Sequence, residues 1–62
     1  MRLRDFKNLH DGDEVYWTDP DEGKCSRYLT IREYNILDED VGLVEIWDKD
    51  GSYLQCFLNE LS

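Results

Sequence analysis

The sequence predicts an all-β fold: a small, strongly bent barrel of four to five short antiparallel strands, with a 3₁₀ turn near each end. The chain has 62 residues, which is enough for one compact domain (residues 1–62) with a single core. It contains no alanine, and its apolar residues are mainly valine, isoleucine, leucine, tyrosine and tryptophan, which favour strands over long helices. Turn-forming residues divide the chain into four short β-like runs.

An irregular or 3₁₀ turn is predicted for the first segment, because apolar side chains recur there at a spacing of three: Leu3, Phe6 and Leu9. We expect this turn to lie against an edge of the core. The sequence His-Asp-Gly-Asp forms a turn before the first strand, residues 14–18, which has Val15 and Trp17 on one face. Proline, glycine and competing aspartates in residues 19–23 then end this strand.

The second strand is longer and runs from about Cys25 to Tyr34. Its alternation places one set of side chains inward, Cys25, Leu29 and Ile31, and the other set outward, Tyr28, Thr30, Arg32 and Tyr34. An acidic connection over residues 35–40 leads to the third strand, residues 41–47. After the fourth strand, residues 52–57, a closing 3₁₀ turn over residues 59–62 brings Leu58 or Leu61 inward.

The register of the last hairpin follows from its loop. A two-residue loop at Asp50 and Gly51 would pair Lys49 with Ser52 and set aliphatic residues opposite polar or aromatic ones. A three-residue loop, with Gly51 as the left-handed residue of a type I turn and G1 bulge, places apolar residues together inside and polar residues together outside. It predicts four cross-strand pairs: Trp47–Tyr53, Ile46–Leu54, Glu45–Gln55 and Val44–Cys56.

These elements fit an SH3-like barrel, and an open meander with one solvated face is the alternative. Closing the sheet would remove exposed edges, which so small a chain has no helices to cover. The predicted core consists of eleven side chains: Phe6, Leu9, Val15, Trp17, Leu29, Ile31, Val44, Ile46, Leu54, Cys56 and one of Leu58 and Leu61.

Two stretches resemble parts of known proteins. Gly12-Asp13-Glu14-Val15-Tyr16-Trp17, followed by Asp-Pro-Asp, resembles the opening of small bacterial and phage proteins with SH3-like barrels. The ending, from Gly51-Ser52-Tyr53 to Phe57-Leu58-Asn59-Glu60-Leu61-Ser62, looks like that of short uncharacterised proteins of bacterial genomes, phages and mobile elements. The resemblance implies the fold and a mobile-element setting, and it carries over no activity and no functional residue.

The charge is strongly acidic and uneven. The net charge is −8, but residues 1–10 carry +2 and residues 11–62 carry −10. Because phosphate contacts need lysine and arginine, this balance disfavours nucleic acid and anionic membranes as partners. Two cysteines are too few for a disulfide-rich secreted scaffold, and the start of the chain has no apolar leader, so we expect free, buried thiols in the cytoplasm.

Enzyme and metal chemistry have little support. His10 is the only histidine, and nothing local brings Cys25, Cys56 or a serine to it, so we predict no catalytic residues and no enzyme. Asp48-Lys49-Asp50-Gly51 has the alternate aspartates of a calcium loop without the rest of that pattern. The other carboxylate clusters are typical of solvated turns, and the cysteines and histidine lack zinc-ligand spacing, so we expect no metal and no cofactor.

The aromatic side chains are the most informative. On the outward phase of the strands lie Tyr16, Tyr28, Tyr34, Trp47 and Tyr53, joined by Leu43 and Phe57. They form either a cross-strand ladder, in part covered by the N-terminal segment, or a protein-binding face. In a meander, Tyr28, Trp47 and Tyr53 would be neighbours in one row. The predicted site is Tyr28, Trp47, Tyr53, Phe57 and the nearby carboxylate of Glu45.

The function predicted from the sequence is therefore that of a small acidic binding module. It would be a monomer that binds a protein partner of basic character, steered by nearby carboxylates. Two alternatives stay open. One is an acidic nucleic-acid mimic that blocks a host DNA-binding protein, and the other is a structural component that assembles with copies of itself.

Overall fold

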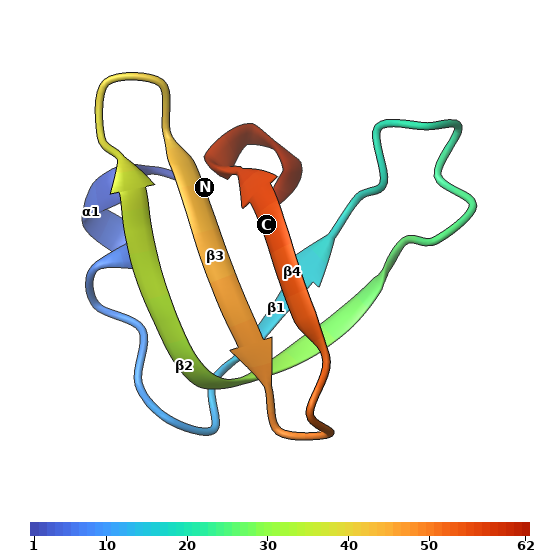
Figure 1. Cartoon of the computed structure of the whole chain (residues 1–62), viewed down its shortest axis with the longest axis horizontal. Helices are drawn as coiled ribbons and strands as arrows, with labels where there is room; N and C mark the ends of the chain where they lie inside the picture. Colours follow the sequence, from blue (N-terminus) through green and yellow to red (C-terminus); the bar gives the residue numbers. More distant parts are fainter.

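The computed structural model describes residues 1–62 and contains four strands and two short helical segments (Figure 1). In chain order the elements are α1 (Leu3–Phe6), β1 (Glu14–Trp17), β2 (Arg27–Asp38), β3 (Leu43–Asp48), β4 (Tyr53–Phe57) and the 3₁₀ helix η1 (Leu58–Glu60). The strands are antiparallel, in the order β1-β2-β3-β4. No helix has the length and apolar character needed to span a membrane.

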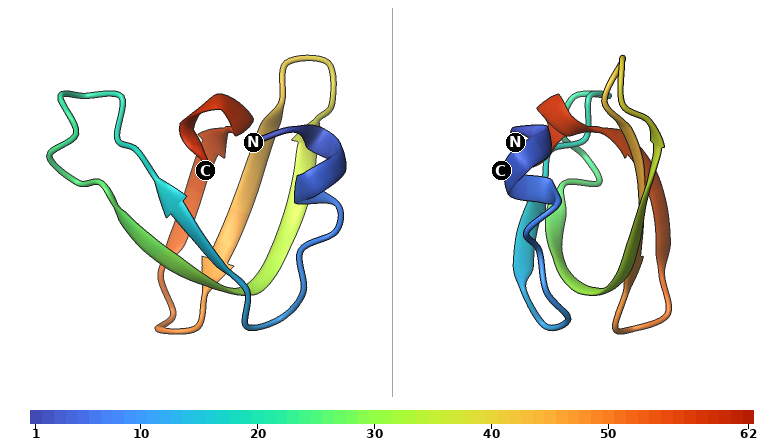
Figure 2. Two further views of the ribbon diagram at one scale, coloured as in Figure 1. Left: turned by 180° about the vertical axis from the view of Figure 1, so that it is seen from behind. Right: turned by 90° about the vertical axis from the view of Figure 1, so that its left-hand side faces the viewer.

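Strand β2 is shared between two layers of the molecule. Its first part pairs with β1, from Glu14 opposite Thr30 to Trp17 opposite Arg27, and its second part pairs with β3. The register shifts between Ile31 and Glu33, where the pairing partner changes. A bulge of this kind bends a strand, and Figures 1 and 2 show β2 curling from one layer into the other.

The C-terminal residues close the other side of the curl. Leu61 forms an isolated antiparallel bridge with Trp17. Tyr16 and Ser62 exchange two backbone hydrogen bonds, both 2.9 Å long. The N-terminal ammonium of Met1 also donates to the carbonyls of Leu58 and Leu61, at 2.9 and 2.8 Å. The fold is thus a small SH3-like barrel, as predicted. It is a curled half-barrel rather than a flat meander, with the end of the chain bridged to β1 and with β4 at its free edge.

The predicted hairpin register is confirmed. All four predicted pairs are present, and Leu43 lies opposite Phe57 as a fifth. The Gly51 N–H donates to the Asp48 carbonyl at 3.0 Å, and the Asp48 N–H donates to the Ser52 carbonyl at 2.9 Å. Gly51 has a φ of +95°, which is why glycine is needed at this position.

Nine buried apolar side chains form the core: Phe6, Val15, Leu29, Ile31, Val44, Ile46, Cys56, Leu58 and Leu61. All nine belong to the predicted set, and Leu58 and Leu61 are both buried rather than only one of them. The other predicted members, Leu9, Trp17 and Leu54, are partly buried and pack against this cluster.

Several predicted boundaries are wrong. The first segment is one turn of α-helix, because the N–H groups of Phe6 and Lys7 donate four residues back at 3.0 Å. A spacing of three does not distinguish this turn from a 3₁₀ turn. Strand β2 begins at Arg27 and continues to Asp38, which leaves only residues 39–42 as the connection to β3.

Cys25 and Tyr34 do not lie where the sequence placed them. Cys25 is exposed in the loop before β2, where its N–H donates to the Asp19 carboxylate at 3.1 Å, so the prediction of two buried thiols holds only for Cys56. Tyr34 points inward, because the bulge after Ile31 reverses the alternation of β2. Its ring meets that of Phe6 at 4.9 Å.

Candidate protein-binding face

The second part of β2 forms a three-stranded sheet with β3 and β4, and one side of this sheet is turned away from the core. We call this side the outer face. It carries nine side chains: the cross-strand rows Glu33–Trp47–Tyr53 and Asn35–Glu45–Gln55, and a third row of Leu43 and Phe57. Leu37, in the second bulge of β2, extends the third row beside Asp38, which is the pairing partner of Leu43. The register that buries Val44, Ile46 and Cys56 places these residues outward, because successive side chains of a strand alternate between its two sides.

The first row contains the aromatic pair Trp47 and Tyr53. Their ring centroids are 5.3 Å apart and the ring planes are inclined by 48°. Tyr53 is 50 % exposed, and Trp47 is partly buried, because the two rings pack against each other across β3 and β4. The pair is thus an apolar platform that remains partly accessible to solvent.

The middle row fixes the carboxylate of Glu45. The Asn35 Nδ2 donates to its Oε1 at 3.1 Å, and the Tyr53 hydroxyl donates to its Oε2 at 2.6 Å. The hydrogen bond to the carboxylate, together with its negative charge, raises the pKa of the Tyr53 phenol above the usual value of 10.0. Glu45 is therefore held in one position, with negative charge at the centre of the outer face.

The third row is apolar. Leu43 lies opposite Phe57, which is 44 % exposed, and Leu37 lies at the second bulge of β2 and is 42 % exposed. Val41, in the turn between β2 and β3, is 60 % exposed. The central carboxylate is consequently flanked by aromatic side chains on one side and by apolar side chains on the other.

Tyr28 does not lie in this arrangement. It is on the first part of β2, where it pairs with Tyr16 of β1, and the two rings meet edge to face at 4.9 Å. It is 65 % exposed. The bend in β2 separates the two parts of the strand, so the row of Tyr28, Trp47 and Tyr53 expected for a flat meander does not form. The structure brings together Glu45, Trp47, Tyr53 and Phe57.

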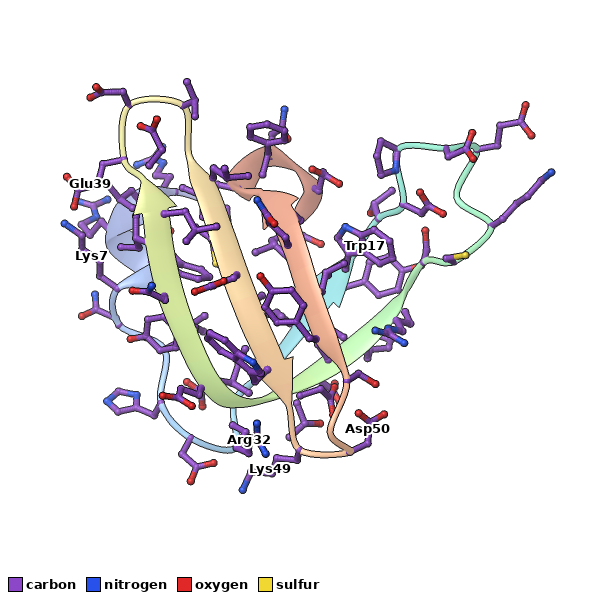
Figure 3. The ribbon with its side chains drawn as sticks, viewed as in Figure 1. Lys7, Trp17, Arg32, Glu39, Lys49 and Asp50 are labelled. Carbon is purple, nitrogen blue, oxygen red and sulfur yellow. The ribbon has the colours of Figure 1, made fainter.

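Two glutamates supply the charge at the nine positions of the outer face, and Arg32 and Asp38 adjoin these positions in the two bulges of β2. The nine positions include Glu33 and Glu45 and no lysine or arginine. Three of the basic side chains form ion pairs in other regions: Lys7 with Glu39 at 3.1 Å, Lys24 with Glu22 at 3.6 Å and Lys49 with Asp11 at 2.9 Å. Figure 3 shows Lys7 and Glu39 at one margin of the sheet and Lys49 at the hairpin end.

The nucleophiles and the histidine are dispersed. Burial, with a smaller contribution from the charge of Glu60, raises the pKa of the Cys56 thiol to about 12. His10 is in an exposed turn, where its Nδ1 is 3.7 Å from the Asp13 carboxylate. The Asp48 carboxylate, from the calcium-like loop, accepts the N–H groups of Thr30 at 2.9 Å and Asp50 at 2.8 Å. This carboxylate is thus engaged in holding the backbone.

Sequence reasoning missed Asn35 as a partner of Glu45. The sequence predicts a connection at this residue, although the β-branched Ile36 beside it favours a strand that continues. Leu37 was missed for the same reason.

Comparison of the chain with protein-family models, with curated proteins and with solved structures finds no match.

Proposed function

We propose that this chain is a non-enzymatic acidic binding module that recognises a protein partner through the outer face. One observation carries the proposal: a carboxylate fixed by two hydrogen bonds lies between an aromatic pair and an apolar row, all on one accessible side of a rigid sheet. Tryptophan and tyrosine are enriched among the residues that dominate binding energy in protein interfaces.

The charge defines the kind of partner. An outer face with two glutamates and no basic residue, on a chain of net charge −8, attracts a basic surface and repels an acidic one. We take the module to be a monomer that acts in the cytoplasm of a bacterial cell, in a phage or mobile-element setting. The exposed free thiol of Cys25 is compatible with a reducing compartment.

Affinity capture tests this proposal. The immobilised chain and its variants are incubated with an extract of the cells that encode it, and bound proteins are quantified by mass spectrometry. Trp47→Ala should reduce capture of a specific partner by roughly 30-fold, which corresponds to a loss of about 2 kcal/mol. Glu45→Gln should weaken capture of a basic partner while keeping the shape of the side chain. Tyr28→Ala is the control, because it removes an exposed aromatic ring outside the outer face.

The same experiment separates the alternatives. A nucleic-acid mimic would keep its partner in the Trp47→Ala variant and lose it between about 50 and 200 mM salt, where surface charges are screened. A structural component would capture copies of itself. If Trp47→Ala and the parent chain capture the same proteins in equal amounts, the outer face is not the binding site.

A further inference from the structure

The sheet has one uncovered edge, and it adjoins the outer face. Strand β1, at one end of the strand order, is joined by the C-terminal residues through the bridge of Leu61 to Trp17. Strand β4, at the other end, pairs only with β3. Figures 1 and 2 show no strand along the outer edge of β4.

The hydrogen-bond pattern identifies which groups this edge presents. The Asp48 N–H donates to the Ser52 carbonyl, and hydrogen-bonded pairs alternate along an antiparallel ladder. Leu54 and Cys56 therefore bond to β3, and the N–H and C=O groups of alternate residues point to the open edge: Tyr53, Gln55 and Phe57. The Phe57 N–H is already occupied, since it donates to Glu60 Oε2 at 2.8 Å. The N–H groups of Tyr53 and Gln55 have no protein partner.

The edge lacks the usual protections against strand pairing. Natural edge strands carry lysine or proline, or contain a bulge that twists the edge away. Strand β4 has the sequence Tyr-Leu-Gln-Cys-Phe, without a charged residue or a proline, and its register with β3 has no shift. Only the Glu60 carboxylate, at the end of the strand, limits access to the edge.

We propose that the outer edge of β4 accepts an extended strand of the partner protein, in which basic residues alternate with apolar ones. This inference rests on the proposed function, because side chains of the added strand would prolong the three rows of the outer face. Basic residues in the added strand would complement the negative charges of Glu45 on the outer face and Glu60 at the edge. A second copy of the chain, with a net charge of −8, lacks this complementarity.

Amide hydrogen exchange followed by NMR tests the inference directly. The probe is a synthetic seven-residue peptide in which lysine or arginine alternates with valine. Its matched control has glutamate in place of every basic residue. At a basic-peptide concentration ten times its Kd, exchange of the Tyr53 and Gln55 amides should slow about tenfold, because both become hydrogen-bonded. The Leu54 and Cys56 amides, already bonded to β3, serve as internal references.

One substitution blocks the edge and spares the fold. In Gln55→Pro the lost N–H points away from β3, and proline is tolerated at such edge positions. The variant should keep the dispersed NMR spectrum of the barrel and lose the protection of Tyr53 by the basic peptide. If the proline variant unfolds, a semisynthetic chain with an N-methyl group on Gln55 removes the same donor with less constraint on the backbone.

The outcomes separate this inference from the proposed function. Protection by the basic peptide alone, lost in Gln55→Pro, supports strand addition. Unchanged exchange with the basic peptide, equal protection by the acidic peptide, or protection that rises with protein concentration alone would overturn it. In affinity capture, loss of the partner in Trp47→Ala but not in Gln55→Pro would leave the outer face as the site and refute the use of the edge.

Discussion

The carboxylate of Asp48 is the one charged side chain buried in the barrel, and its removal should destabilise the fold strongly. It is 8 % exposed and accepts the Thr30 N–H and the Asp50 N–H through its two oxygens. The bond from Thr30 connects the β3–β4 hairpin to β2, and the bond from Asp50 lies within the hairpin loop. In Asp48→Ala, the partly buried Thr30 N–H loses its partner, whereas the exposed Asp50 N–H can turn to water.

The magnitude follows from these two environments. A hydrogen bond to a charged group contributes about 1.5–3 kcal/mol, and a buried N–H left without a partner costs about 1–3 kcal/mol. Because the second donor is solvated, we expect Asp48→Ala to lower the free energy of unfolding by about 2–4 kcal/mol. Asp48→Asn keeps one acceptor and should lose about half as much. A domain of 62 residues has a total stability of only about 3–9 kcal/mol.

Urea denaturation followed by tryptophan fluorescence measures the effect. With an m-value of about 1 kcal/mol/M, the midpoint for Asp48→Ala should fall by about 2–4 M. Asp50→Ala is the matched control: its exposed carboxylate accepts only the Ser52 N–H in the same loop, at 2.8 Å, so the shift should be much smaller. Equal midpoints for the two variants would refute the structural role assigned to Asp48.

Three further predictions concern other parts of the chain. With iodoacetamide at pH 8, the folded protein should gain one label, at the exposed Cys25, because the raised pKa of the Cys56 thiol keeps that thiol protonated. Mass spectrometry of peptides locates the label, and early labelling of Cys56 would contradict this prediction. Tyr53 should ionise above pH 10 in an absorbance titration, and Glu45→Gln should reduce the rise in its pKa without removing the part due to desolvation. Because the folded-state pKa is raised, the associated stability is present below the unfolded pKa and lost as pH rises through the folded pKa. Gly42→Ala should cost about 1–2 kcal/mol in urea denaturation, because Gly42 has a φ of +72°, and an unchanged midpoint would argue against this conformation.

The last hairpin could be predicted residue by residue because its register depends on local chemistry. Gly51 admits the left-handed conformation of the loop, and only one register placed Val44 and Ile46 opposite apolar partners. Four residues of the candidate site lie on this hairpin, so their common location followed from the same reasoning: Glu45, Trp47, Tyr53 and Phe57.

Strand β2 could not be predicted in the same way, because its shape depends on distant contacts. The bulge after Ile31 occurs where the partner changes from β1 to β3, which simple alternation along the chain does not show. This bulge turned Tyr34 inward and separated Tyr28 from the aromatic pair of the hairpin. The inclusion of Asn35 in the site likewise depended on knowing that β2 extends to Asp38.

The two hydrogen bonds of the Glu60 carboxylate have a consequence for aggregation. One oxygen accepts the Trp17 indole N–H at 3.1 Å and so helps to join β1 to the end of the chain; the other accepts the Phe57 N–H. Losing this side chain would loosen the closure of the barrel and, at the same time, lengthen the row of free amides on β4. Unprotected edges of this kind are templates for uncontrolled assembly. A single carboxylate thus couples the conformational stability of the monomer to its colloidal stability.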